Sequence, residues 1–269
     1  MSSPLAAALL ELALANRIVA NEGVLDVFGH VSMRHPDHPG RYLLSRSRAP
    51  ELISPEDFIE YDLDSRPLAE PGVPQYTERV IHGEIYKARP DVMAVCHHHS
   101  PAFMPLIATG ADYVPVFHLG SIGGMKPPYW DQHDEFGDTN MLVVKPEEGA
   151  SLARALGDKW MVLMRRHGVT VTGANVRECV YRTINSCRNA DFQVRAMMIG
   201  GIASLSPGET KLAAQNTGKT TGLSRAWEYW TLRITKAGNL PSASKKKTGG
   251  KRAAAKPRGR VGRAKKRRA

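Results

Sequence analysis

The segment Thr77–Pro101 constrains the fold most, because it joins a helical pattern to a buried strand that runs into three consecutive histidines. A proline ends the predicted helix of residues 77–89, and the apolar, β-branched run that follows is typical of a buried strand. If that strand continues through His99, alternation places His97 and His99 on one face of the sheet and His98 on the other. Two imidazoles spaced in this way can hold one metal ion.

Three further residues make this pattern a candidate metal site. His167 ends a hydrophobic strand, and Gly168 beside it lets the backbone approach a site closely. Glu78 stands at the start of the helix that leads into the histidine strand. Three neutral imidazoles and a movable carboxylate suit a catalytic divalent ion, whereas a structural site is closed by four firm ligands. The alternative is that these histidines are hydrogen-bonded residues of the core.

The net charge of +11 belongs to the C-terminal end of the chain. Of the 37 Lys and Arg, 13 lie from Pro241 onward with no acid, so 24 basic and 26 acidic residues precede it, a net charge of −2. Residues 237–269 have no periodicity and almost nothing apolar, which predicts a disordered tail after a catalytic domain of residues 1–236. Such a tail can bind nucleic acid or another polyanion weakly, by counterion release.

Several classes of protein are excluded by what the chain lacks. There is no basic segment ahead of the N-terminal apolar residues and no uninterrupted apolar run of about 18 residues, so neither a signal peptide nor a membrane span is expected. The three cysteines are an odd number without metal-finger spacing, which argues against a secreted disulfide scaffold. We therefore expect a cytoplasmic protein.

Helical and strand patterns alternate along the chain. Helices are predicted over residues 4–23, 77–89, 100–108, 146–156, 175–199 and 222–235, a single helical turn over 54–57, and strands over 29–35, 41–46, 58–63, 92–99, 113–118, 141–144, 160–165 and 169–172. Most strands follow one another through short turns, and helices lie between some of them. This order favours an α/β protein with a mixed, mostly antiparallel sheet covered by helices.

The motifs around these residues resemble the class II aldolase/adducin family. They are Glu78-x-x-x-His, I-Y-x-x-R-P-D-V-x-A-V-x-His-x-His-S-P, and a later R-x-His-G. The resemblance implies an α/β/α layered fold and a homotetramer with sites at subunit interfaces. It also implies that His97, His99 and His167 bind one divalent ion per subunit, with Mn²⁺ or Zn²⁺ first and Co²⁺ or Fe²⁺ as alternatives. Glu78 would be the acid/base or an exchangeable ligand.

Departures from the sugar-phosphate enzymes of that family bear on the substrate. Their phosphate is held by Gly-Asn, Thr-Gly and Ser-Ser pairs, where this chain has Gly29-His30, Arg46-Ser47 and Tyr76-Thr77. Small donors and backbone N–H groups hold phosphate better than bulky side chains. Arg46 and Arg48 instead offer guanidinium forks for carboxylates, unless they are ordinary surface residues of a hairpin.

One branch of the family is more similar than the rest. The runs FGHVSMRHPD, L-x-SRS-x-AP and IHGEIYKARPDV resemble the 3-hydroxy-2-methylpyridine-4,5-dicarboxylate and dihydroxyphthalate decarboxylases. This implies non-oxidative decarboxylation of a hydroxylated aromatic acid, with Glu78 as the proton donor. One alternative is an aldolase acting on a hydroxy acid, an oxo acid or a sugar phosphate. The other is an adducin-like interaction protein without enzymatic activity.

Three neighbours are further candidates for substrate binding. His82 lies four residues after Glu78 on the same helix face, so it either tunes the acid or simply packs. His30 is expected to line the pocket, although no spacing fixes it there. Tyr229 is kept because family members use a C-terminal tyrosine that reaches the site of a neighbouring subunit; the alternative is an aromatic residue of the core.

Overall fold

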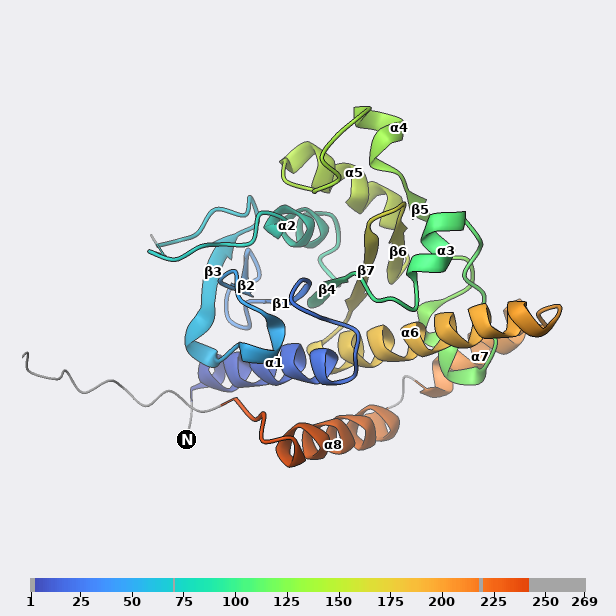
Figure 1. Ribbon diagram of the computed structural model, residues 1–269. Helices are drawn as coiled ribbons and strands as arrows, with labels where there is room; N and C mark the ends of the chain where they lie inside the picture. The colour runs from blue at the N-terminus through green and yellow to red at the C-terminus, as the bar shows by residue number, and fades with distance from the viewer. Residues whose placement is uncertain (1–2, 70, 218–219, 242–269) are drawn as a thin grey trace, which may run out of the picture.

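The computed structural model describes residues 3–69, 71–217 and 220–241, and the rest of the predicted tail, 242–269, lies outside the described residues. A seven-stranded sheet lies between two layers of helices, with α2 and α5 on one side and α1, α6 and α8 on the other (Figure 1). The predicted α/β/α layering is therefore correct. The helices are α1 Pro4–Asn21, α2 Arg79–Ala88, α3 Met104–Thr109, α4 Gln132–Phe136, α5 Pro146–Leu156, α6 Val176–Ile199, α7 Pro207–Thr217 and α8 Thr220–Lys236.

The sheet has the strand order β3-β2-β1-β4-β7-β6-β5. Every neighbouring pair is antiparallel except β5 and β6, which are parallel, so the sheet is mixed and mostly antiparallel as predicted. The strands are β1 His30–Arg34, β2 Arg41–Ser45, β3 Phe58–Asp62, β4 Ala94–His98, β5 Tyr129–Trp130, β6 Met161–Met164 and β7 Gly168–Gly173.

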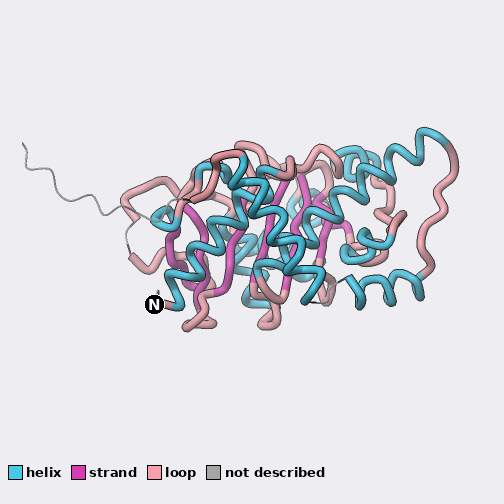
Figure 2. Tube along the Cα trace, turned by 90° about the horizontal axis from the view of Figure 1, so that it is seen from below, coloured by secondary structure: helices cyan, strands magenta, loops and turns pink. Residues whose placement is uncertain are grey.

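Alternation along the strands divides the core into two clusters, one on each face of the sheet. In β4, Ala94 and Cys96 face the α1, α6 and α8 layer, whereas Val95 faces α2 and α5. Seen from below, the helices of the α1, α6 and α8 layer cross in front of the strands (Figure 2). His97 shares the face of Val95, which places it beneath the N-terminal end of α2.

Helix α1 is 18 residues long and, by length and composition alone, apolar enough to cross a membrane, which the sequence prediction did not anticipate. In the fold its apolar face packs into the core, where Leu12, Ile18 and Val19 are fully buried. It also contains two buried polar residues. Asn16 bonds to the backbone of Val31, and Arg17 bonds to Ile53 and Asn239. These contacts are those of a core helix.

Helix ends follow the start and stop residues of the sequence. Ser3 caps α1 by accepting from the N–H of Ala6 at 3.2 Å, and Asn175 caps α6 by accepting from the N–H of Glu178 at 2.8 Å. Helix α5 begins at Pro146 and stops before Gly157, whose φ of +55° suits glycine. The predicted bounds of α5 and α6 are confirmed to within one residue.

Two predicted strands are wrong. Residues 113–118 and 141–144 form no strand, although both runs are apolar and β-branched. Side chains satisfy their backbone groups instead: Asn189 and Gln193 of α6 bond to the first segment, and Glu78 and Glu148 accept from the N–H groups of the second. Helices α4 and α7 were also not anticipated.

Candidate metal centre and cavity

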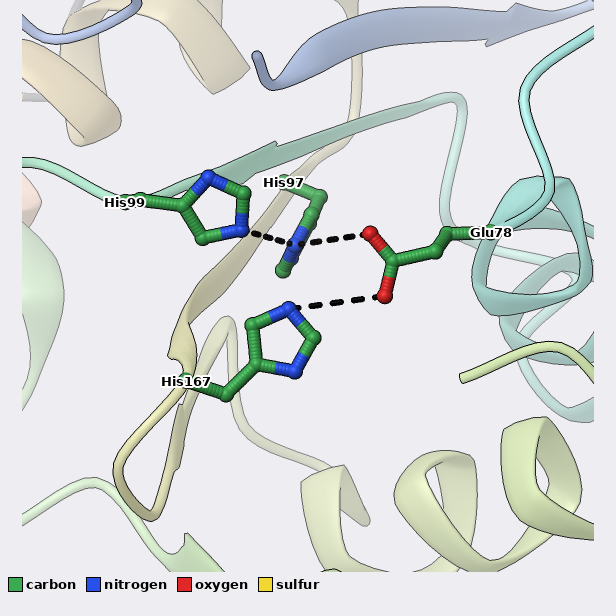
Figure 3. A group of neighbouring side chains, drawn as sticks. All are labelled: Glu78, His97, His99 and His167. Atoms are coloured by element: carbon green, nitrogen blue, oxygen red, sulfur yellow. Dashed lines mark hydrogen bonds and ion pairs between the residues drawn. The ribbon is translucent and has the colours of Figure 1, made fainter. Parts of the chain in front are cut away.

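Three histidines and one glutamate converge at one edge of the sheet (Figure 3). His97 is in β4, His99 lies one residue past its end, and His167 is in the turn between β6 and β7. Glu78 is the residue immediately before α2. One ligand atom from each lies within 4.8 Å of all the others, so the four side chains could hold a single ion.

The separations between these atoms fit one shared ion. The Nε2 atoms of His97 and His99 are 3.1 Å apart. Two imidazoles bonded to one ion at roughly 2.0–2.1 Å would be separated by about 2.9–3.4 Å. Glu78 Oε1 lies 3.4 Å from His167 Nε2, and its Oε2 lies 3.8 Å from His97 Nε2. The donor set of three nitrogens and one carboxylate is one that Zn²⁺ and other divalent transition metals accept.

The protonation of the histidines suits this role. Burial lowers the pKa of His97 well below its ordinary value, with a further contribution from neighbouring imidazoles, and lowers that of His167 to about 4. Burial also lowers the pKa of His99. Near neutral pH all three rings are therefore uncharged. His97 Nδ1 lies 3.1 Å from Thr170 Oγ1, which itself donates to Met164 Sδ, so Nδ1–H donates and Nε2 keeps its lone pair for the centre.

Glu78 is held where its carboxyl can gain or lose a proton. Its side chain is nearly buried, and burial raises its pKa to about 7, although the N–H of Val143 donates to Oε1 at 3.0 Å and opposes that shift. A carboxyl group that titrates near neutral pH can act as a general acid or base. When ionised, it can equally bind an ion as a ligand.

Two glycines permit the close packing at the cluster. A Cβ on Gly168 would lie 2.5 Å from the His98 carbonyl oxygen and 2.8 Å from His99 Cδ2, so only glycine lets β7 approach the histidine strand there. Gly29 has φ of +88°, and a Cβ there would lie 2.9 Å from the His97 carbonyl oxygen. The close approach predicted for Gly168 is confirmed.

His98 points to the opposite side of the sheet, as the alternation predicts. Its Nδ1 accepts from the N–H of Ser100 at 3.3 Å, and its ring lies 5.8 Å from that of Phe103. The sulfur of Cys187 is 4.0 Å from its Nε2. All three cysteines of the chain are free and buried.

The cluster opens into a cavity of about 660 Å³. Glu78, His99 and His167 line one part of it. Its other walls combine apolar and aromatic side chains with two arginines and one histidine, namely Phe28, Tyr76, Met141, Leu142, Arg48, Arg166 and His30. A cavity of this size with a few polar groups is typical of a binding site for a small organic molecule.

Arg46 and Arg48, the two arginines predicted to bind a substrate carboxylate, lie in different places. Arg48 lines the cavity, whereas Arg46 does not. Both arginines pair with Asp57, at 2.7 Å from Arg48 and 2.6 Å from Arg46. Burial alone would raise the pKa of Asp57, but hydrogen bonds from both arginines and from the N–H of Ser54 lower it. Arg48 is further fixed because Tyr76 donates to its carbonyl oxygen.

The remaining candidates are not all brought to the cavity. His30 lines it, and His82 is fully buried one layer behind, with its Nε2 2.7 Å from His30 Nδ1. Tyr229 lies on α8 with 55% of its surface exposed, and it is not among the residues that line the cavity.

Arg166 is a cavity residue that the sequence interpretation missed. It has a positive φ of +57° and donates to both carboxylate oxygens of Asp131, at 2.9 and 2.8 Å. Its position next to His167 in the sequence was the one signal that could have indicated a place in the cavity. The pairing with Asp131, 35 residues earlier, depends on the fold and cannot be read from spacing.

Comparison with known proteins agrees with this architecture. A family model described as the class II aldolase and adducin N-terminal domain matches residues 10–194. The chain is 30% identical over 243 residues to decarboxylase tropJ of Talaromyces stipitatus, covering 82% of this chain and 91% of that protein. It is 28% identical over 242 residues to a 3,4-dihydroxyphthalate decarboxylase of Arthrobacter keyseri, covering 84% and 93%.

A solved structure shows the same fold. The L-fuculose 1-phosphate aldolase of Glaciozyma antarctica superposes with a TM-score of 0.73 at 21% identity, covering 90% of this chain and 96% of that one. Together with the family match over residues 10–194, the layered sheet and the cluster at its edge lead to one conclusion. The chain belongs to the class II aldolase and adducin family.

Proposed function

We propose that the protein is a divalent-metal-dependent carbon–carbon lyase that removes carbon dioxide from a hydroxylated aromatic acid without oxidation. The proposal rests on one observation: Glu78, His99 and His167 of the cluster line the same cavity as two aromatic side chains and two arginines. The relatives named for decarboxylases support this reaction class. The chemistry of those walls favours a flat, anionic substrate.

His97, His99 and His167 would hold one divalent ion per subunit, Mn²⁺ or Zn²⁺ in the first instance, with Glu78 as a movable fourth ligand. When bound, such an ion supplies a Lewis acid and a template for the oxygen atoms of the substrate. The chain's own residues supply the remaining functions, which are orientation of the substrate and movement of a proton.

Orientation falls to the cavity walls. Arg48 offers a guanidinium, and Phe28 and Tyr76 offer ring faces against which an aromatic acid can pack. Asp57 holds Arg48 at 2.7 Å and so fixes where its charge lies. A carboxylate that approaches the cavity therefore meets a positioned donor.

Glu78 is the proposed proton donor. As the bond between the ring carbon and the carboxylate breaks, carbon dioxide leaves and the electron pair stays on the ring. The protonated carboxyl of Glu78 then gives its proton to that carbon and regains one from solvent. A pKa raised to about 7 by burial keeps a substantial protonated fraction near neutral pH.

The direct test measures carbon dioxide release from a panel of hydroxy-aromatic dicarboxylates, with manganese, zinc, cobalt and iron supplied in turn. We expect release with at least one ion and none after chelation. A panel without release, together with aldehyde release from a sugar phosphate or a hydroxy acid, would favour the aldolase alternative. No bound ion and no effect of chelation would favour an adducin-like interaction protein.

Three further properties are part of the proposal. We expect a homotetramer, as the family resemblance implies, with a neighbouring subunit covering Val27 and Phe28, which are 65% and 67% exposed beside the cavity; the mass in solution tests this. We expect a cytoplasmic location.

The basic tail would give weak, salt-sensitive DNA binding that disappears on truncation at Gly238.

A further inference from the structure

Four buried polar side chains form a continuous hydrogen-bonded series beside the cluster. Ser32 Oγ lies 2.7 Å from the Tyr86 hydroxyl and 2.6 Å from His82 Nδ1. His82 Nε2 lies 2.7 Å from His30 Nδ1. None of the four is more than 2% exposed, and they alternate between helix α2 and strand β1. We call them the tyrosine–histidine chain.

The direction of these hydrogen bonds follows from what each group can donate. Among the described residues, Ser32 Oγ is the acceptor available to the Tyr86 hydroxyl, and burial raises the pKa of that phenol, so it keeps its proton. The Ser32 hydrogen is then free for His82 Nδ1, which must accept. The reverse direction would leave the buried Tyr86 hydrogen without an acceptor, which native structures avoid.

The tautomers of both histidines then follow. Burial lowers the pKa of His82 to about 3 and that of His30 well below its ordinary value, so both rings are neutral near pH 7. His82 accepts at Nδ1, so its single proton is on Nε2, from which it donates to His30 Nδ1. His30 must in turn have its proton on Nε2.

That last N–H has no hydrogen-bond partner among the residues that the structure describes, and His30 lines the cavity. His30 lies opposite His97 across β1 and β4, with ring centroids 5.5 Å apart, and its ring is 4.5 Å from that of Tyr76. The donor is therefore next to the candidate ligands without belonging to them.

We propose that His30 presents an N–H donor of fixed tautomer to an anionic oxygen of the substrate, and that His82 and Ser32 are positioning residues that hold it in that form. The inference rests on the proposed function only for the identity of the acceptor, a carboxylate oxygen of the aromatic acid. The opposite tautomer would present a lone pair to the same oxygen and repel it. The tyrosine–histidine chain thus selects for an acceptor at this position.

The tautomer can be measured without substrate or metal, by NMR of the full chain with ¹⁵N-labelled histidine. We expect His30 to show a protonated Nε2 and an unprotonated Nδ1, with a coupling through the hydrogen bond to His82 Nε2. Ser32→Ala should mix the tautomers of His30. Tyr42→Phe is the control. It removes another buried hydroxyl, which bonds to Ser65 and Arg79 and not to any member of the tyrosine–histidine chain, and it should leave the tautomer of His30 unchanged.

Two substitutions of His82 separate positioning from packing. Glutamine can place its amide N–H near the former Nε2 and still donate to His30, whereas asparagine reaches only the Nδ1 position. We expect His82→Asn to raise KM for the aromatic acid about tenfold with a smaller effect on kcat, and His82→Gln to raise it much less. Metal content should match the wild type in both.

A wild-type His30 with its proton on Nδ1, or an unchanged tautomer in Ser32→Ala, would overturn the inference. Equal KM values for the asparagine and glutamine variants would overturn the positioning role. If no hydroxy-aromatic acid is turned over by the wild type, the proposed function fails, while the tautomer measurement still decides the inference.

Discussion

Two groups of histidines lie side by side on one face of the sheet and differ in how their ring nitrogens are paired. In the tyrosine–histidine chain, both ring nitrogens of His82 pair with protein atoms at 2.6 and 2.7 Å. In the cluster, the Nε2 atoms of the three histidines point instead toward one another and toward Glu78. The histidines of the cluster therefore leave their Nε2 atoms to a shared centre, whereas His82 has no free nitrogen to offer an ion.

The largest effect is expected when a ligand of the cluster is removed, whereas a change at the adjacent histidine should have little effect. His99→Ala should lower metal affinity by more than the roughly 10- to 100-fold loss typical of residues that only support a ligand, and should abolish turnover. His98→Asn is the matched control, because it faces the other side of the sheet and keeps an acceptor for the Ser100 N–H. Metal content by mass spectrometry measures both. An equal loss of bound metal in the two variants would refute the placement of His99 and His98 on opposite faces of the sheet.

Glu78 is the acidic member of the cluster, and the tyrosine–histidine chain contains no acid. Glu78→Gln should keep most of the bound metal, because three histidines remain, and should lower the rate of decarboxylation by about 10²- to 10⁴-fold, as expected for loss of a general acid. Turnover of a demonstrated substrate at the wild-type rate would rule out its role as proton donor.

The tyrosine–histidine chain should make stability depend on pH. Burial lowers the pKa of His82 to about 3 from an ordinary 6.5. Between these values the unfolded state binds more protons, so the free energy of unfolding falls as pH falls. From pH 6.5 to 5 the loss from His82 should be about 2 kcal/mol.

Denaturant unfolding of the metal-free protein at several pH values measures this slope, and His82→Gln should flatten it. His82 contacts His30 and Tyr42 directly and is joined to Tyr86 through Ser32. The two tyrosines do not titrate in this range. His30 and the cluster histidines would leave a residual slope of the same sign, and Glu78, whose pKa is raised, would contribute with the opposite sign. Identical slopes in the two proteins would show that His82 titrates normally in the fold.

The smallest effect separates two arginines that share one carboxylate. Arg48→Ala should raise KM for the aromatic acid about tenfold, the loss expected for one charged hydrogen bond, whereas Arg46→Ala should change it by less than about threefold. Both variants remove a bond to Asp57, so their losses of stability should be similar. A larger KM effect for Arg46 would mean that the cavity wall is assigned to the wrong arginine.

Local chemistry made much of this fold predictable. The proline and glycine that bound α5, the cap of α6 by Asn175 and the alternation of His97, His98 and His99 all act within a few residues of the chain. These signals are strong because the backbone and the pleat of the strand enforce them directly. The grouping of Glu78 with the histidines was suggested by its place at the start of the helix that leads into the histidine strand, and the motif resemblance then implied its role.

The errors arise where distant side chains replace local partners. Residues 113–118 have a strand-like composition, but Asn189 and Gln193 of α6 take the hydrogen bonds that a neighbouring strand would have formed. Arg46 and Arg48 both pair with Asp57, yet only Arg48 lines the cavity, a difference that the two residues' sequence context does not show. The tyrosine–histidine chain was not visible either, because it requires α2 to lie against β1 at one register. Such pairings depend on tertiary packing, which no window of sequence contains.

The central claim is that Glu78 and three histidines hold one catalytic divalent ion. The most direct measurement is the divalent-metal content of the purified full chain, before and after EDTA, with carbon dioxide release assayed on the same samples. We predict about one ion per chain, loss of both ion and activity with EDTA, and recovery of both on adding metal back. A full chain that contains no divalent ion, binds none when it is supplied, and is unaffected by EDTA would contradict the claim.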